Sequence, residues 1–293
     1  SYGVTSINGR PHAETIALRK NKKENCGSTM YLTLEPCSHY GKTPPCTNAI
    51  IKSKIRKVYY SSEDFDYRSY KKSKKLLKSK KIIVNNGLLI NEIKDLYRSY
   101  NYSKKNNYPY IIGKLACSSN FYILKNNSYI TNEHSRNVSQ ILRYENHGIL
   151  TTYKTVNSDN PKLTCRLSGL EKFSPVRIIV DKDLRTNINS YIVKNSKKVK
   201  TIIFHNSNNK KKIICFKNKN IKLIFNKVDR DGYFNLKKIL KKIYNLGIHK
   251  LLIESGNDFT KKMLSENLFN EFYLFLGNKK LNIKNKININ LII

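Results

Sequence analysis

Short apolar runs alternate with amphipathic stretches along the chain, and this alternation predicts an α/β protein. In the first hundred residues, helical spacing covers 12–20, and a lysine-rich amphipathic stretch ends at Lys81. Thr43 and Pro44 are residue types that cap and open a helix, so we expect a helix to begin there with Cys46 in its first turn. Three apolar runs of strand length complete this region: TMYLTL (29–34), VYYSS (58–62) and IIVNN (82–86).

A polar segment rich in tyrosine and lysine, residues 98–109, lacks apolar periodicity and predicts the boundary between two domains. A length of 293 residues is also typical of a two-domain protein. We therefore expect a first domain at residues 1–105 and a second domain at residues 106–293.

The second domain has the pattern of another α/β layer structure. Its runs of strand length lie at 110–117, 148–152, 176–181, 200–205, 221–226, 250–255 and 271–277. Helical stretches separate some of them, at 133–146, 235–246 and 258–267. This order predicts a largely parallel sheet. Two runs of lysine and asparagine, 206–212 and 278–290, are expected to be polar surface.

Composition narrows the class of protein. Hydrophobic residues make up 39% of the chain and the mean hydropathy is −0.55, without an apolar run long enough to cross a bilayer. The net charge is +36, but the lysines are spread from end to end among Asn, Ile and Tyr, as codon bias would produce, so we expect no specific nucleic-acid partner. Six scattered cysteines without a secretory leader indicate a reducing compartment, the cytoplasm, with some cysteines as metal ligands. Assembly into a homo-oligomer is left open.

The strongest chemical signal is a set of metal-ligand residues in the first domain. His12, Cys37 and Cys46 supply one imidazole and two thiols, and Glu14 follows the imidazole by two residues. Three protein ligands leave zinc an open position for water. Hydrolytic deamination by zinc also needs a carboxylate outside the ligand set to carry the proton to the leaving amine, and Glu14 has the spacing for that role.

A closed structural zinc site is the alternative to a catalytic one. It needs a fourth strong ligand, for which His39 and Cys26 are available in sequence. The pairing of His-Ala-Glu with Pro-Cys favours the catalytic interpretation. The thiols of Cys37 and Cys46 are separated by eight residues, whereas deaminases of nucleic acids usually have Pro-Cys-x-x-Cys.

Two segments, GRPHAE (9–14) and TLEPCSHYGKTPPCTNAII (33–51), resemble the deaminase domain of the bifunctional riboflavin-biosynthesis deaminase/reductase family. That family's motif is PHAE followed by TLEPCxHxGxTPPC. The resemblance implies a cytidine-deaminase-like three-layer domain followed by a dihydrofolate-reductase-like domain. It also implies that His12, Cys37 and Cys46 bind Zn²⁺ and that Glu14 is the proton shuttle. The family's domain begins with a helix and strands that precede the matched part, so we expect the first domain to lack them.

The second half resembles the family's reductase domain at several separate motifs. Residues 155–166 follow the pattern TVxxDxPxLTxR, GKLA at 113–116 matches the opening strand, and LIESG at 252–256 matches a later strand and turn. The resemblance implies NADPH contacts at Ala116, Tyr129, Thr155, Asp159, Gly256, Asn257, Asp258, Phe259, Thr260, Lys261 and Lys262. Lys182, which directly follows the strand run 176–181, is a further candidate for a cofactor contact. The resemblance also implies substrate contacts at Lys114, Asn127, Arg143, Leu163, Arg166 and Glu254. Where the family has Ser-x-Asp-Gly, this chain has residues 118–121 ending in Phe121, so we expect that loop to run differently.

The family resemblance implies a bifunctional enzyme of riboflavin biosynthesis acting on a small-molecule pyrimidine ribosyl phosphate. Its first reaction would be zinc-dependent hydrolytic deamination of 2,5-diamino-6-ribosylamino-pyrimidinone 5′-phosphate, and its second would be reduction of the ribosyl side chain to ribityl with NADPH. Two alternatives remain open at this point. One is a zinc deaminase of RNA or nucleotides with an appended binding domain, and the other is a reductase, or a protein without catalysis, that carries a decayed zinc-binding deaminase domain.

Overall fold

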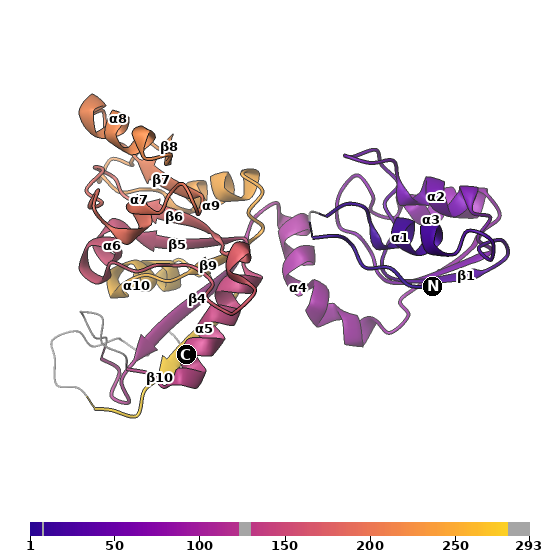
Figure 1. Cartoon of the computed structure of the whole chain (residues 1–293), viewed down its shortest axis with the longest axis horizontal. Helices are drawn as coiled ribbons and strands as arrows, with labels where there is room; N and C mark the ends of the chain where they lie inside the picture. Colours follow the sequence, from indigo (N-terminus) through magenta and orange to yellow (C-terminus); the bar gives the residue numbers. More distant parts are fainter. Residues whose placement is uncertain (8, 123–129, 281–293) are drawn as a thin grey trace. The chain divides into compact units, whose positions relative to one another are not determined.

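A computed structural model describes all residues except 8, 123–129 and 281–293. The chain forms two compact units, Ser1–Asn107 and Tyr108–Ile293 (Figure 1).

The first unit is built on a three-stranded parallel sheet with the order β1-β2-β3. Its strands are β1 (Thr29–Leu34), β2 (Lys57–Ser62) and β3 (Ile83–Asn86), and its helices are α1 (Ala13–Lys20), α2 (Cys46–Lys52), α3 (Lys72–Ser79) and α4 (Ile90–Asn106). Side chains alternate between the two faces of a strand. Val58 and Tyr60 of β2 pack with Leu18, Ile50 and Leu77, so α1, α2 and α3 cover one face.

Helix α4 covers the opposite face of this sheet. The hydroxyl groups of Thr33 on β1 and Tyr97 on α4 lie 2.7 Å apart, and Asn101 donates to the Ser62 hydroxyl at 3.3 Å. Helix, sheet and helix form the three layers that the sequence predicted. Helix α4 was not predicted, and it continues through most of the segment 98–109 that we expected to be the domain boundary. The two compact units divide within that segment, after Asn107. The sheet-facing side of α4 consists of tyrosine, asparagine and serine, which the search for apolar periodicity does not detect.

Helix α2 begins two residues later than expected. Pro45 is its N-cap and Cys46 its first residue, so Thr43 and Pro44 lie outside the helix. The consequence for chemistry is small, because Cys46 still lies in the first turn, where unpaired backbone N–H groups favour a thiolate.

The second unit is built on seven parallel strands with the order β10-β4-β9-β5-β6-β7-β8. The strands are β4 (Tyr110–Cys117), β5 (Gly148–Thr152), β6 (Val176–Val180), β7 (Thr201–His205), β8 (Lys222–Phe225), β9 (Lys250–Ile253) and β10 (Glu271–Leu276). The helices are α5 (Glu133–Glu145), α6 (Tyr153–Asp159), α7 (Tyr191–Lys194), α8 (Lys210–Asn218), α9 (Leu236–Asn245) and α10 (Asn257–Ser265), with a 3-10 turn at Glu171–Phe173. The predicted parallel sheet is confirmed.

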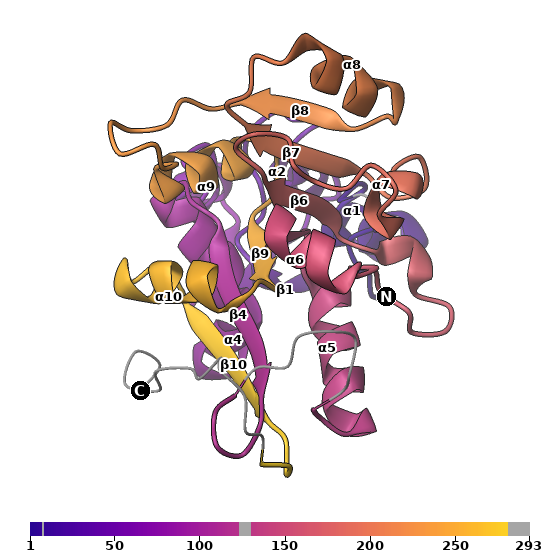
Figure 2. The ribbon, with the colours of Figure 1, turned by 90° about the vertical axis from the view of Figure 1, so that its left-hand side faces the viewer.

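Helices cover both faces of this sheet (Figure 2). On one face α9 packs Leu236, Ile239, Leu240 and Ile243 against the strands, a spacing that places all four on one side of the helix. In Figure 2 helices α5, α6 and α7 lie on the other side of the strands. Both faces are therefore apolar, which explains why most of its strands are nearly continuous apolar runs.

Three short helices of this unit were not predicted. They are α6, α7 and α8, of seven, four and nine residues. Helix α8 begins inside the run 206–212 that we expected to be polar surface, and the Asn209 side chain caps it by accepting from the Lys212 N–H at 3.1 Å.

The loop after β4 contains an unusual backbone conformation. Phe121 has φ of +64°, which favours glycine, and it occupies the place of the glycine in the family's Ser-x-Asp-Gly pattern. Its N–H donates to the Ser118 carbonyl at 2.9 Å, and the Ser118 N–H donates to the Tyr122 carbonyl at 2.9 Å. A left-handed residue thus stands at this position without a glycine, and the Phe121 side chain packs against the buried cluster of Leu115 and Cys117.

No helix in the described part of the chain is both long and apolar enough to cross a membrane.

Candidate active sites

The first site brings together three predicted metal ligands from separate elements. His12 is the N-cap of α1, Cys46 is the first residue of α2, and Cys37 follows the end of β1. His12 Nδ1 lies 3.1 Å from Cys46 Sγ and 3.5 Å from Cys37 Sγ. All three ligand atoms lie within 4.8 Å of one another. Nitrogen and sulfur ligands on one tetrahedral zinc ion lie about 3.5 Å apart, so the donor set and its spacing fit zinc.

The fourth position of this site is open among the described residues. His39, one candidate for a fourth ligand, has its Nδ1 2.9 Å from the Ser69 hydroxyl, and Cys26, the other, is exposed. Neither belongs to the group of close ligand atoms. A site with three ligands is typical of catalytic zinc rather than of a closed structural centre.

The surroundings of the ligands favour a thiolate at Cys37. A hydrogen bond from the Cys46 thiol lowers the pKa of Cys37 to about 4 against the opposing effect of burial, with help from His12. The backbone N–H of Cys46 also donates to Cys37 Sγ at 3.2 Å. The same hydrogen bond, together with burial, raises the pKa of Cys46. Glu14 is buried in the first turn of α1 beside the ligands, and this burial raises the pKa of its carboxyl group.

A buried acidic network beside the site was not predicted from the sequence. The Glu35 carboxylate accepts from the Asp64 N–H at 3.3 Å, from the Lys71 N–H at 3.2 Å and from the Ser73 hydroxyl. These bonds hold the loop between β2 and α3, and Ser69 of that loop contacts His39. The signal in the sequence is Glu35 itself, a carboxylate between a buried strand and the metal ligand Cys37.

A second site lies at the carboxyl ends of the strands in the second unit. Arg143 of α5 donates to Glu254, which follows β9, through Nε to Oε1 at 2.7 Å and through Nη2 to Oε2 at 2.8 Å. Lys114 Nζ of β4 lies 3.8 Å from Glu254 Oε2. Arg166 is close enough to add its charge to this group. The structure therefore brings together four of the six predicted substrate residues.

Arg143 has a partner that the sequence did not predict. Its guanidinium group makes two parallel hydrogen bonds with the Glu254 carboxylate, a geometry that fixes both side chains. The arginine thus orients Glu254, and its contact with the substrate stays a prediction.

The positive charges of Arg143 and Lys114 beside Glu254 make the stability of the second unit depend on pH in the acid range. Burial alone would raise the pKa of Glu254, but Arg143 and Lys114 lower it to about 2 from its ordinary value of 4.5. A carboxylate with a lowered pKa in the folded state stabilises the fold above its unfolded pKa, and that stabilisation is lost as pH falls from about 4.5 toward 2. Urea unfolding followed by circular dichroism should therefore show a smaller pH dependence for Glu254→Gln than for the unaltered chain in this window. Equal slopes would contradict the pairing.

The predicted cofactor residues gather partly at the start of α10. The Gly256 N–H donates to the Thr155 hydroxyl at 3.1 Å, which joins the N-terminus of α10 to the first turn of α6. The first N–H groups of a helix have no partner within it and favour phosphate. In this turn the Phe259 side chain packs against the core and Thr260 is buried, so backbone N–H groups rather than these side chains are available to a ligand.

Other predicted contacts are spread more widely. Lys182 donates to the Gly232 carbonyl at 3.2 Å, and Asp159 accepts from the Ser158 hydroxyl at 2.6 Å. Lys262 lies 5.0 Å from the Tyr233 ring. The remaining residues sit on the same elements: Ala116 on β4, Asn257, Asp258 and Lys261 on α10, and buried Leu163 after α6. Asn127 and Tyr129 lie outside the described residues.

Two family models match the sequence. The RibD C-terminal domain matches residues 110–281, and the cytidine and deoxycytidylate deaminase zinc-binding region matches residues 3–62. These matches confirm the expected order of a deaminase-like domain and a reductase domain.

Relatives and solved structures agree with the models. The riboflavin biosynthesis protein RibD of Aquifex aeolicus is 34% identical over 279 residues, which cover 92% of this chain and 75% of that protein. The RibD structure of Acinetobacter baumannii has a TM-score of 0.84 at 25% identity and covers 95% of this chain and 76% of its own. A diaminohydroxyphosphoribosylaminopyrimidine deaminase/5-amino-6-(5-phosphoribosylamino)uracil reductase of Thermotoga maritima has a TM-score of 0.79, with the same identity and coverage. The chain therefore belongs to the RibD family of riboflavin-biosynthesis enzymes, in which a zinc-binding deaminase domain is joined to a reductase domain.

Proposed function

We propose that residues 1–105 deaminate 2,5-diamino-6-ribosylamino-pyrimidinone 5′-phosphate and that residues 106–293 then reduce the ribosyl side chain of the product to ribityl with NADPH. The cluster of His12, Cys37 and Cys46 beside buried Glu14 is the observation that carries this proposal. Similarity to the deaminase/reductase of Thermotoga maritima supports the choice of substrate. The cytoplasm is part of the proposal, because all six cysteines are free and thiol ligands need reducing conditions.

In the first reaction His12, Cys37 and Cys46 hold the metal and Glu14 moves the proton. A bound zinc ion supplies a Lewis acid that lowers the pKa of water toward neutrality. Glu14 accepts a proton as water attacks the amino-bearing ring carbon and delivers it to the departing amine, so that the ring gains a carbonyl oxygen and ammonia leaves. Its burial excludes bulk water from this transfer.

The second reaction needs a hydride at C1′ of the ring-opened imine form of the substrate and a proton from solvent at the nitrogen, so that the C=N bond becomes a single bond. Bound NADPH would supply the hydride. Lys114 and Arg166 supply positive charge for the 5′-phosphate, and Arg143 fixes the carboxylate of Glu254 beside Lys114. Thr155 and the first N–H groups of α10 are placed to receive cofactor phosphate.

Mass spectrometry of the substrate separates the two activities. Zinc-loaded protein should replace the amine by a carbonyl without NADPH, and should add two hydrogens when NADPH is present. After removal of zinc by a chelator, deamination should stop while the supplied deaminated intermediate is still reduced. Reduction without deamination by the zinc-loaded chain would leave only the reductase part of the proposal. No change in either assay would contradict both parts.

Exchange of Arg166 for alanine tests the phosphate seat. Because charge-assisted hydrogen bonds to phosphate contribute about 1.5–3 kcal/mol, Arg166→Ala should raise the KM for the deaminated intermediate about 10-fold or more. The assay follows NADPH oxidation at varied intermediate concentration. Arg19→Ala is the matched control, since Arg19 is an exposed arginine of the first unit. An unchanged KM for Arg166→Ala would remove this residue from the substrate site.

A further inference from the structure

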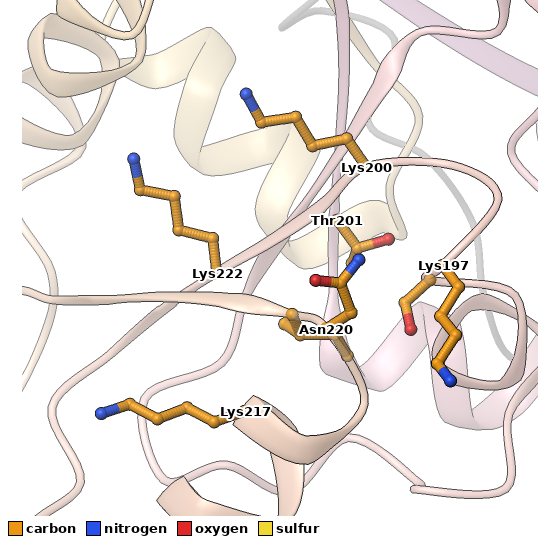
Figure 3. A pocket seen from close by; sticks show the side chains of 8 residues that line it. Lys197, Lys200, Thr201, Lys217, Asn220 and Lys222 are labelled. Carbon is orange, nitrogen blue, oxygen red and sulfur yellow. The ribbon is translucent and has the colours of Figure 1, made fainter.

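A separate pocket lies at the far edge of the seven-stranded sheet (Figure 3). It has a volume of about 350 Å³, within the size range of sites for small molecules. Eight residues line it: Ser196, Lys197, Lys200, Thr201, Lys217, Asn220, Ile221 and Lys222. We call this the lysine pocket.

The lysine pocket lies at the opposite end of the strands from the proposed reductase site. Lys200 immediately precedes β7 and Lys222 is the first residue of β8, so the pocket lies at amino ends. Thr155 and Glu254 follow β5 and β9 at their carboxyl ends. All seven strands are parallel, so the lining residues of the pocket and the reductase residues lie at opposite ends of the strands.

The lining of this pocket is strongly cationic. Its four lysines share the pocket with no carboxylate. Within the described residues, none of their ammonium groups donates a hydrogen bond or forms an ion pair. Figure 3 shows Lys200 and Lys222 extending to the same side, with Lys217 and Lys197 on opposite sides of Asn220. Charges distributed in this way suit a ligand with several separated negative groups better than a single anion.

A buried arginine holds one wall of the pocket in place. Arg177 is fully buried, and its Nε donates to the Thr201 hydroxyl at 3.1 Å. Its Nη2 donates to the carbonyl groups of Ile192, Asn195 and Val199 at 2.9–3.0 Å. The loop fixed by these bonds carries Ser196 and Lys197. Arg177 Nη1 has no hydrogen-bond partner among the described residues, so this guanidinium adds an incompletely compensated positive charge next to Thr201, which lines the pocket.

We propose that the lysine pocket binds a small molecule with two or more linked phosphate groups, such as a nucleoside triphosphate or a free polyphosphate. The spread of the four lysines matches linked phosphates, and the volume matches a metabolite. Single-stranded nucleic acid fits less well, because sites for it stack bases on aromatic side chains and the lining contains none.

Calorimetric titration of the zinc-loaded full chain tests this proposal with ATP and inorganic tripolyphosphate as probes. Saturating NADPH keeps the reductase site occupied. A constant ionic strength keeps the screening of charges equal in all titrations. The variant Lys200→Gln/Lys222→Gln should weaken binding of the phosphate probe about 10-fold or more. Lys237→Gln/Lys238→Gln removes two exposed lysines of α9 at equal net charge and should change binding less than about 2-fold.

The outcomes separate the sources of phosphate and the competing explanations. Tighter binding of ATP than of tripolyphosphate assigns a nucleotide, and equal binding assigns the phosphate chain alone. The proposal is overturned if neither probe binds or if both double variants lose binding equally. It is also overturned if single-stranded RNA competes with ATP for the pocket and, at raised salt, binds more tightly than ATP does.

Discussion

Replacing Glu14 with glutamine should abolish ammonia release while zinc remains bound. General acid–base catalysis contributes about 10²–10⁴-fold to rate, so the deaminase turnover should fall by at least about 10²-fold. Glutamine keeps the size and hydrogen-bonding shape of glutamate but cannot carry the proton. The assay measures ammonia and the zinc content of the same sample.

Two comparisons make this result specific. Glu24→Gln changes an exposed carboxylate of the same unit, one that accepts from the Asn21 side chain, and should leave deamination intact. The reductase reaction of Glu14→Gln on supplied intermediate should also remain unchanged. Retained ammonia release would exclude Glu14 as the proton shuttle, and loss of zinc would assign it a role in holding the metal.

Replacing Arg143 with alanine should damage the second unit severely. The exchange removes both arms of the hydrogen-bonded pair with Glu254 and leaves a carboxylate that is 11% exposed without its main counter-charge. Removing one partner of a buried ion pair costs about 3–5 kcal/mol of stability. Reductase kcat/KM should therefore fall together with resistance to urea, followed by circular dichroism because the chain contains no tryptophan.

A second substitution tests the cause of that loss. Arg143→Ala/Glu254→Gln removes the stranded charge, so it should regain part of the stability that Arg143→Ala loses, although not the reductase activity. Arg143→Lys keeps the positive charge but not the two parallel hydrogen bonds. Its stability should lie between that of the unaltered chain and that of Arg143→Ala. Additive losses in the double variant would show that Arg143 and Glu254 act independently.

Local patterns were sufficient to predict most of the architecture. Continuous apolar runs predicted the strands because both faces of the second sheet are covered by helices. Helix α4 was not predicted, and one reason is that Tyr97 and Asn101 contact the sheet through hydroxyl and amide groups. The four-residue helix α7 was missed because it is little more than one helical turn, which is too short for an amphipathic pattern to repeat.

The two candidate sites differed in how well the sequence predicted them. The metal ligands belong to a recognisable sequence motif. His12 and Cys46 lie at the starts of α1 and α2, and Cys37 follows β1, so the fold of one small unit brings them together. The pair of Arg143 and Glu254 spans 111 residues, and sequence spacing cannot show that one arginine holds both oxygens of one carboxylate. The roles of the remaining reductase residues stay predictions.

The strand order of the second sheet has a consequence for synthesis on the ribosome. Strand β4 is the first strand of its unit, yet it pairs only with β9 and β10, which are the last described strands. A nascent chain therefore carries β4 unpaired until more than a hundred further residues have been made. Pairs so distant in sequence form slowly, and exposed strand edges promote aggregation. The metal-binding unit has no such delay, so we expect it to fold first and the reductase unit to be the part that depends on chaperones.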